Sequence, residues 1–111
     1  MVQLVRIRRR GGLVVQDCDV YIGRACHMGG WSLSQSPWYN PFSARQYGRE
    51  ECIRLYREHL LADGNLLARL PELMYQTLGC WCSPEPCHGD VLVEMVRELE
   101  EEEEAMWSGV D

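Results

Sequence analysis

Three cysteines and one histidine, Cys80, Cys82, Cys87 and His88, stand close together near the C-terminal end of the sequence. Thiolate sulfur and imidazole nitrogen are ligands that Zn²⁺ prefers, and four of them can make a tetrahedral site. Alternation along a strand would put Cys80 and Cys82 on one face, and the proline-containing loop that follows could fold Cys87 and His88 back toward them. One interpretation of this segment is therefore a zinc site with all four residues as ligands.

Two other interpretations are open for the same residues. Cys82 or Cys87 could be a nucleophile, and Cys87 falls at the expected start of a helix, where the helix dipole lowers the pKa of a thiol. His88 could be the base of that nucleophile, or a general acid or base by itself. Alternatively the set is structural: Cys80 is a small core residue, Cys87 caps the helix and His88 hydrogen-bonds the loop.

A second group of residues, Arg24, Trp38, Asn40 and Asp90, predicts ligand binding. Arg24 and the free N–H groups at the start of the last helix could hold a phosphate or a carboxylate. Trp38 could stack on a base, and Asn40 would stand beside the ligand. Asp90 lies in the first helical turn, where it could satisfy the helix dipole itself or accept a hydrogen bond from a ribose hydroxyl or a base N–H.

The elements that must position these residues follow from the apolar pattern. Alternation and helical periodicity predict, in chain order, strands over 2–8 and 19–23, a helix over 44–62, a strand over 77–82 and a helix over 88–105. On the first helix, the inward stripe consists of Cys52, Ile53, Tyr56 and Leu60, and Arg49 belongs to the outer face. The loop over 24–43 has no periodic pattern, and loops of about 20 residues inside a small domain are more often functional than idle.

The order strand, helix, strand implies a crossover between two parallel strands. The loops after Ile22 and after Cys82 would then leave the carboxyl edge of one sheet, which is where ligands bind in open α/β sheets. We therefore expect an α/β fold: a small Rossmann-like domain of two or three layers, with a short, mostly parallel sheet and the site at the carboxyl edge of the strands.

Composition bounds the class of protein. The 111 residues suffice for one domain, expected over residues 1–99 and followed by an acidic, solvated tail over 100–111. Residues 98–111 hold seven acids and no base, and without them the net charge is +1 instead of −6. No apolar stretch is long enough for a signal peptide or a membrane span, so we expect a cytoplasmic protein with reduced cysteines.

All 11 basic residues are arginine, and four lie together as Arg6, Arg8, Arg9 and Arg10. Because arginine suits phosphate contacts, this patch could touch nucleic acid. The body of the chain lacks the strongly basic balance of a dedicated DNA-binding protein, which favours a solvated strand end instead.

Three motifs carry a resemblance to a known family. They are Tyr-Ile-Gly-Arg at 21–24, Ser-Pro-Trp-Tyr-Asn-Pro-Phe at 36–42, and Gly-Cys-Trp-Cys-Ser-Pro-Glu-Pro-Cys-His-Gly-Asp at 79–90. In order and spacing they resemble a domain family of unknown function found in bacteria, phages and large DNA viruses. The resemblance covers residues 19–97 and implies a small α/β domain in a phage-like context. It implies matched residues at the carboxyl edge: Arg24, Asn40, Cys82, Cys87, His88 and Asp90.

The leading hypothesis is a protein that binds a nucleotide- or nucleobase-like ligand, and it could be an enzyme of nucleotide or nucleic-acid modification. This choice follows from the phage-like context that the resemblance implies. One alternative is a non-catalytic binding module stabilised by zinc. Another is a phage-encoded interaction protein that acts on a host factor. The sequence does not fix a reaction, nor whether the protein is an enzyme.

Overall fold

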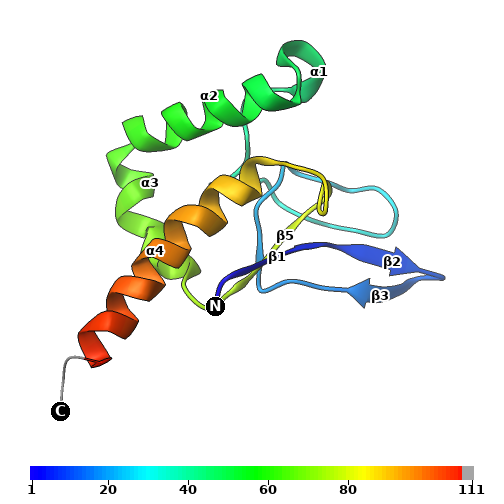
Figure 1. The fold of residues 1–111 in the computed structure, drawn as a ribbon. Coiled ribbons are helices and arrows are strands. Elements are labelled where there is room, and N and C mark those ends of the chain that lie inside the picture. Colours follow the sequence, from blue (N-terminus) through cyan, green and yellow to red (C-terminus); the bar gives the residue numbers. More distant parts are fainter. Residues whose placement is uncertain (109–111) are drawn as a thin grey trace.

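The centre of the fold is a parallel sheet of three short strands in the order β1-β5-β4, seen in a computed structural model that describes residues 1–108 (Figure 1). Its strands are β1 (Gln3–Arg6), β4 (Val20–Tyr21) and β5 (Thr77–Cys80). The last strand in the sequence is the middle one, and its Leu78 and Cys80 are buried. The parallel pair that the crossover predicts is thus present, and the mixed α/β class with a short parallel sheet is confirmed.

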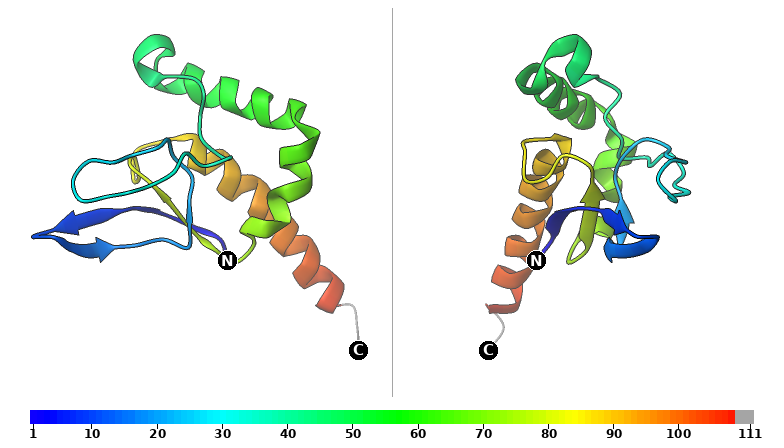
Figure 2. Two further views of the ribbon diagram at one scale, coloured as in Figure 1. Left: turned by 180° about the vertical axis from the view of Figure 1, so that it is seen from behind. Right: turned by 90° about the vertical axis from the view of Figure 1, so that its right-hand side faces the viewer.

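A hairpin continues the first strand beyond the sheet. The predicted strand over 2–8 is split at Ile7, which is buried and donates its N–H to the Cys80 carbonyl at 3.0 Å. The chain then forms β2 (Arg8–Arg10) and β3 (Leu13–Gln16), joined by Gly11 and Gly12 at φ values of 57° and 80°. Two central residues with positive φ are typical of the tight hairpin turn that matches strand twist. Figures 1 and 2 show that the hairpin extends away from the rest of the fold.

Four helical segments precede the last strand: α1 (Ala44–Tyr47), α2 (Arg49–Ala62), α3 (Gly64–Arg69) and the 3₁₀ turn η1 (Leu70–Leu73). The prediction of one helix over 44–62 is wrong at Gly48. This residue has φ 83° and ψ 157°, outside the helical region, so it ends α1 and precedes α2. The predicted inward stripe of α2 is confirmed, because Cys52, Tyr56 and Leu60 are buried.

Helix α4 (His88–Ser108) lies along one side of the sheet, and the loop that follows β4 lies on the other (Figure 2). Gly89 marks the contact between helix and sheet, since a Cβ there would lie 2.6 Å from Leu4 and 2.9 Å from Ile22. Among residues 1–108, no helix is both long and apolar enough to cross a membrane.

The boundary predicted between residues 99 and 100 falls inside α4. Glu100 is fully buried, and its carboxylate accepts the Val2 N–H at 2.8 and 3.0 Å and the Tyr75 N–H at 2.7 Å. The expectation of a solvated acidic tail is therefore wrong at residue 100, because this side chain joins α4 to the segments that lead into β1 and β5. Residues 109–111 of the predicted tail lie outside the described residues.

Candidate functional site

A cavity of about 400 Å³ opens at the carboxyl ends of β4 and β5. The loop after β4, the loop after β5 and the start of α2 form its walls. Most of the residues singled out in the sequence line it, and they are Arg24, Asn40, Cys80, Cys82, Cys87 and His88. We call this space the edge cavity. The convergence of the two loops follows from the parallel crossover, as the sequence predicts.

Arg24 and Asn40 form one wall of the edge cavity. The Arg24 guanidinium donates through Nε and Nη2 to the Asn40 carbonyl, at 3.3 and 3.0 Å. The Asn40 side chain holds its own loop, because Oδ1 accepts the Phe42 N–H at 2.9 Å and Nδ2 donates to the Cys52 carbonyl at 3.4 Å. Asn40 therefore fixes the loop against α2 and positions Arg24.

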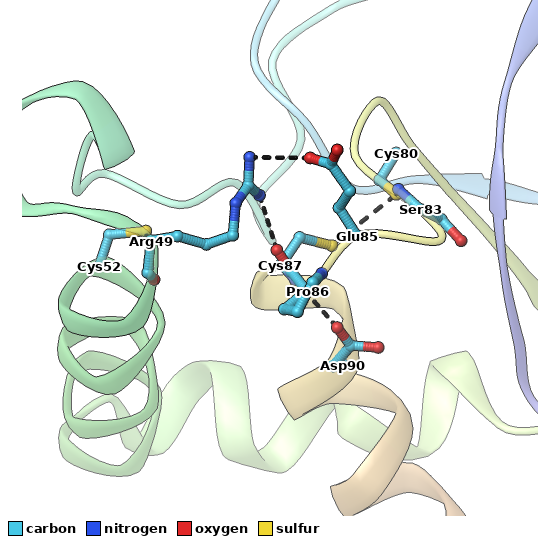
Figure 3. Close-up of polar contacts among 8 residues, drawn as sticks. All are labelled: Arg49, Cys52, Cys80, Ser83, Glu85, Pro86, Cys87 and Asp90. Carbon is cyan, nitrogen blue, oxygen red and sulfur yellow. Dashed lines mark hydrogen bonds and ion pairs between the residues drawn. The ribbon is translucent and has the colours of Figure 1, made fainter.

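Arg49, which the sequence predicts on the outer face of the helix, has an exposed side chain that reaches the loop after β5 and lines the edge cavity. Its Nη1 donates to the Pro86 carbonyl at 2.7 Å, and its Nη2 lies 3.2 Å from the Glu85 carboxylate (Figure 3). Contact with the Cys82 thiol is the largest cause of a raised pKa for Arg49. The spacing was the signal that could have indicated this contact, because Arg49 lies three residues before the buried Cys52 and shares its face of the helix.

Cys80 and Cys87 form a buried sulfur pair with Sγ atoms 3.8 Å apart. The thiol of Cys87 donates to Cys80 and lowers the pKa of Cys80, and the Ser83 N–H at 3.4 Å acts in the same direction. The same contact, followed by burial, raises the pKa of Cys87. Cys87 is thus the proton donor of the pair, and its geometry does not favour the nucleophilic role predicted for it.

Cys87 also begins α4, in the structural role that the third interpretation gives it. Its sulfur accepts the Gly89 N–H at 3.3 Å. The Cys87 N–H is in turn accepted by Asp90 Oδ2 at 2.9 Å (Figure 3). This is a reciprocal capping arrangement with cysteine in the place of serine. Asp90 does not line the edge cavity, so the contact with a ribose or base predicted for it has no geometric support.

His88 lies between the sheet and α2. Its Nε2 is 2.7 Å from the Ile22 carbonyl, to which it donates, and its ring meets Tyr56 edge-on at 4.9 Å. Desolvation by burial lowers the pKa of His88, so the imidazole is neutral and Nδ1 retains its lone pair. His88 is one of the residues that line the edge cavity.

The four-ligand zinc site stays a prediction. His88 donates Nε2–H to the Ile22 carbonyl, which leaves Nδ1, and Cys80 and Cys87 lie together with the Ser83 and Gly89 N–H groups on their sulfurs. Within residues 1–108, no group of three or more His, Cys, Asp or Glu side chains is arranged to hold a metal ion.

Trp38 is a core residue and does not line the edge cavity. Its side chain is 2% exposed, its carbonyl accepts the Tyr56 hydroxyl at 2.8 Å, and the Arg69 guanidinium lies 5.8 Å from its ring. The stacking contact predicted for Trp38 is therefore not available there. Phe42 and Trp81 supply the aromatic lining instead.

We expect the lowered pKa of His88 to make stability depend on pH. Above about pH 6.5 His88 is neutral in both the folded and the unfolded chain, whereas below it the unfolded chain takes up a proton more readily. Stability is therefore lost as pH falls through this region. Urea unfolding of the native protein and of His88→Gln at pH 8, 7, 6 and 5 should show a difference in unfolding free energy that shrinks on acidification. Two curves that stay parallel would contradict this origin.

Comparison with known proteins finds two relatives from viruses. The chain is 42% identical over 105 residues to an uncharacterised protein, R718, of Acanthamoeba polyphaga mimivirus, covering 87% of this chain and 81% of that protein. It is 33% identical over 66 residues to an uncharacterised 12.4 kDa protein from the nrdA-td intergenic region of Enterobacteria phage T4, covering 56% of this chain and 61% of the phage protein. No solved structure matches. The profile of one family matches residues 5–98, and the chain therefore belongs to the family described as Domain of unknown function (DUF4326).

Proposed function

We propose that this protein binds a nucleotide-like anion in the edge cavity, with Arg24 and Arg49 on its phosphate. The observation that carries the proposal is that two arginines, from different elements, line one cavity whose other walls are largely apolar. Guanidinium groups bind phosphate through paired N–H donors, and small-ligand pockets combine an apolar lining with a few such polar groups. A volume of about 400 Å³ is in the range of such pockets.

Both arginines have donors to offer a ligand. Arg24 gives two of its five N–H groups to the Asn40 carbonyl and keeps the others. Arg49 pairs with Glu85, whose side chain is 71% exposed, and such surface pairs contribute little. A phosphate can replace that carboxylate at small cost. Phe42 and Trp81 then provide aromatic surface for a base.

A second candidate function, nucleotide modification, is favoured by the lining of the edge cavity, which includes Cys82 and His88 as well as the two arginines. Under this candidate, Cys82→Ser retains nucleotide binding and loses the product that mass spectrometry finds after incubation with the native protein.

The finer features of the fold support the same location for the ligand. We infer a Rossmann-like arrangement because β4 and β5 are parallel neighbours joined through α2, with the cavity beyond their carboxyl ends. We also propose a cytoplasmic location, since all six cysteines are free thiols.

The test is calorimetric titration with the four common ribonucleoside monophosphates. We expect at least one to bind the native protein, and Arg24→Ala and Arg49→Ala each to weaken it about tenfold or more, because each removes charged hydrogen bonds. Arg54→Ala is the matched control: Arg54 also lies on α2, but it pairs with Glu51 and Glu58 away from the cavity, and its loss should leave affinity within about twofold.

Two outcomes would refute the proposal. In the first, none of the four monophosphates binds at millimolar concentration. In the second, a monophosphate binds but Arg24→Ala and Arg49→Ala match the native affinity.

A further inference from the structure

We propose that the nucleotide held in the edge cavity belongs to a single-stranded nucleic acid, whose neighbouring phosphates lie along the arginines of the hairpin. This inference rests on the proposed function and names its substrate class. We call Arg6, Arg8, Arg9 and Arg10 the arginine strip; they follow one another along β1 and β2.

The first observation is an uneven distribution of charge. Residues 1–49 contain seven arginines and two acids, Asp17 and Asp19, whereas residues 50–111 contain four arginines and 15 acids. The hairpin, the loop after β4 and the start of α2 all belong to the basic half. The glutamates of α4 run away from them, toward the opposite end of the molecule (Figure 1). The edge cavity therefore lies at the positive end of a protein that is acidic as a whole.

The second observation is a further cavity that adjoins the first. It has a volume of about 660 Å³ and is lined by three residues of the arginine strip together with Trp31 and Trp81. Trp81 and Cys26 line both cavities, so the two spaces meet at Trp81. A chain with one nucleotide in the edge cavity can continue across Trp81 into this second space.

The second cavity has the chemistry that unpaired bases and phosphates need. Trp31 and Trp81 meet edge-to-face at 5.8 Å, and the Arg9 guanidinium lies 5.4 Å from the centre of the Trp31 ring. Aromatic rings beside arginines are the usual platform for single-stranded nucleic acid, because every base has a face that stacks and every linkage has a phosphate.

The arginine strip is also free to bind an anion. Among the described residues, Arg6, Arg8 and Arg10 have no carboxylate within ion-pair distance, whereas Arg54, Arg57 and Arg69 are each paired with glutamate. Arg6, Arg8 and Arg10 are exposed. Unpaired surface cations on one face raise the local concentration of a polyanion.

A single strand fits this surface better than a duplex. The base must enter a cavity beyond the ends of the strands, and a paired base cannot do so without leaving its helix. The described residues that line the two cavities include no acid, which distinguishes this face from one that would bind a basic protein.

The test is fluorescence anisotropy with labelled 12-mers of uridylate and thymidylate and a 12-base-pair duplex, at 50 to 200 mM KCl. We expect at least one single strand to bind about tenfold or more tightly than the duplex. Arg6→Ala/Arg8→Ala/Arg10→Ala should weaken strand binding at least tenfold. It should also flatten the slope of log affinity against log salt by about two, since each single-strand phosphate contact contributes about 0.7. Preference between the two 12-mers then assigns RNA or DNA.

Arg54→Ala/Arg57→Ala/Arg97→Ala is the control, because it removes the same charge from residues outside both cavities. If this control weakens binding of the single-stranded 12-mers as much as Arg6→Ala/Arg8→Ala/Arg10→Ala does, the proposed surface is wrong. The proposed surface is also wrong if a monophosphate binds in the edge cavity but no 12-mer binds more tightly than that monophosphate. This second result would leave the proposed function intact. Failure of both monophosphates and 12-mers overturns both proposals.

Discussion

Replacing Glu100 with alanine is expected to lower the free energy of unfolding by about 3 to 5 kcal/mol, which is a large part of the stability of a small domain. The carboxylate accepts three hydrogen bonds from two backbone N–H groups, those of Val2 and Tyr75. Alanine leaves both donors without a partner in a buried place and opens a cavity there.

Urea unfolding followed by circular dichroism measures this effect, with Glu102→Ala as the matched control. Glu102 lies on the same helix two residues later and is exposed, so its loss should change stability by less than about 0.5 kcal/mol. Glu100→Gln keeps one acceptor oxygen and should fall between the two. If Glu100→Ala and Glu102→Ala unfold at the same urea concentration, the carboxylate does not hold the chain as the geometry indicates.

Replacing Gly79 with alanine is expected to lower the free energy of unfolding by about 3 kcal/mol, a large fraction of the stability of a typical domain. Gly79 lies in the middle strand, where it pairs with Val5 on one side and Tyr21 on the other. An added Cβ would overlap the Cys18 sulfur and lie 2.7 Å from both Cys18 Cβ and Ile7 Cγ2. Because Ile7 is buried and β5 is paired on both edges, neither strand nor side chain can move away cheaply.

Gly64→Ala provides the comparison for this substitution. Gly64 begins α3, and a Cβ there would meet nothing within 4 Å, so alanine should be neutral or slightly stabilising through its better helix propensity. Relative to the native protein, the melting temperature should therefore fall by many degrees in Gly79→Ala and stay the same or rise slightly in Gly64→Ala. Equal melting temperatures would show that the space around the middle strand is not as tight as these distances require.

The carboxyl-edge site could be predicted from the sequence because it depends on few long-range facts. A strand ending near Gly23, a helix, and a strand ending near Cys82 suffice to bring Arg24 and His88 to one edge when the crossover is parallel. Local capping chemistry was also accessible: Cys87 and Asp90 have the spacing of a capping pair, as one of the interpretations held.

Other parts of the site could not be predicted, for reasons of tertiary context. An irregular loop does not show which of its aromatic residues faces inward, so Trp38 and Phe42 could not be told apart as core and cavity residues. Arg49 shares a helix face with Cys52, but only the position of the loop after β5 shows what its guanidinium contacts. Glu100 stands in a uniform run of glutamates, and only the positions of Val2 and Tyr75 show that it is the buried one.

The contact between Val2 and Glu100 joins residues that are 98 positions apart in the chain. The pairing of β1 with β5 is almost as distant, since Gln3 lies beside Thr77. During synthesis the first strand therefore leaves the ribosome long before its neighbour in the sheet exists, and it must wait with its apolar residues uncovered. A fold closed by such distant contacts forms after translation of nearly the whole domain, and more slowly than a helical bundle of equal length.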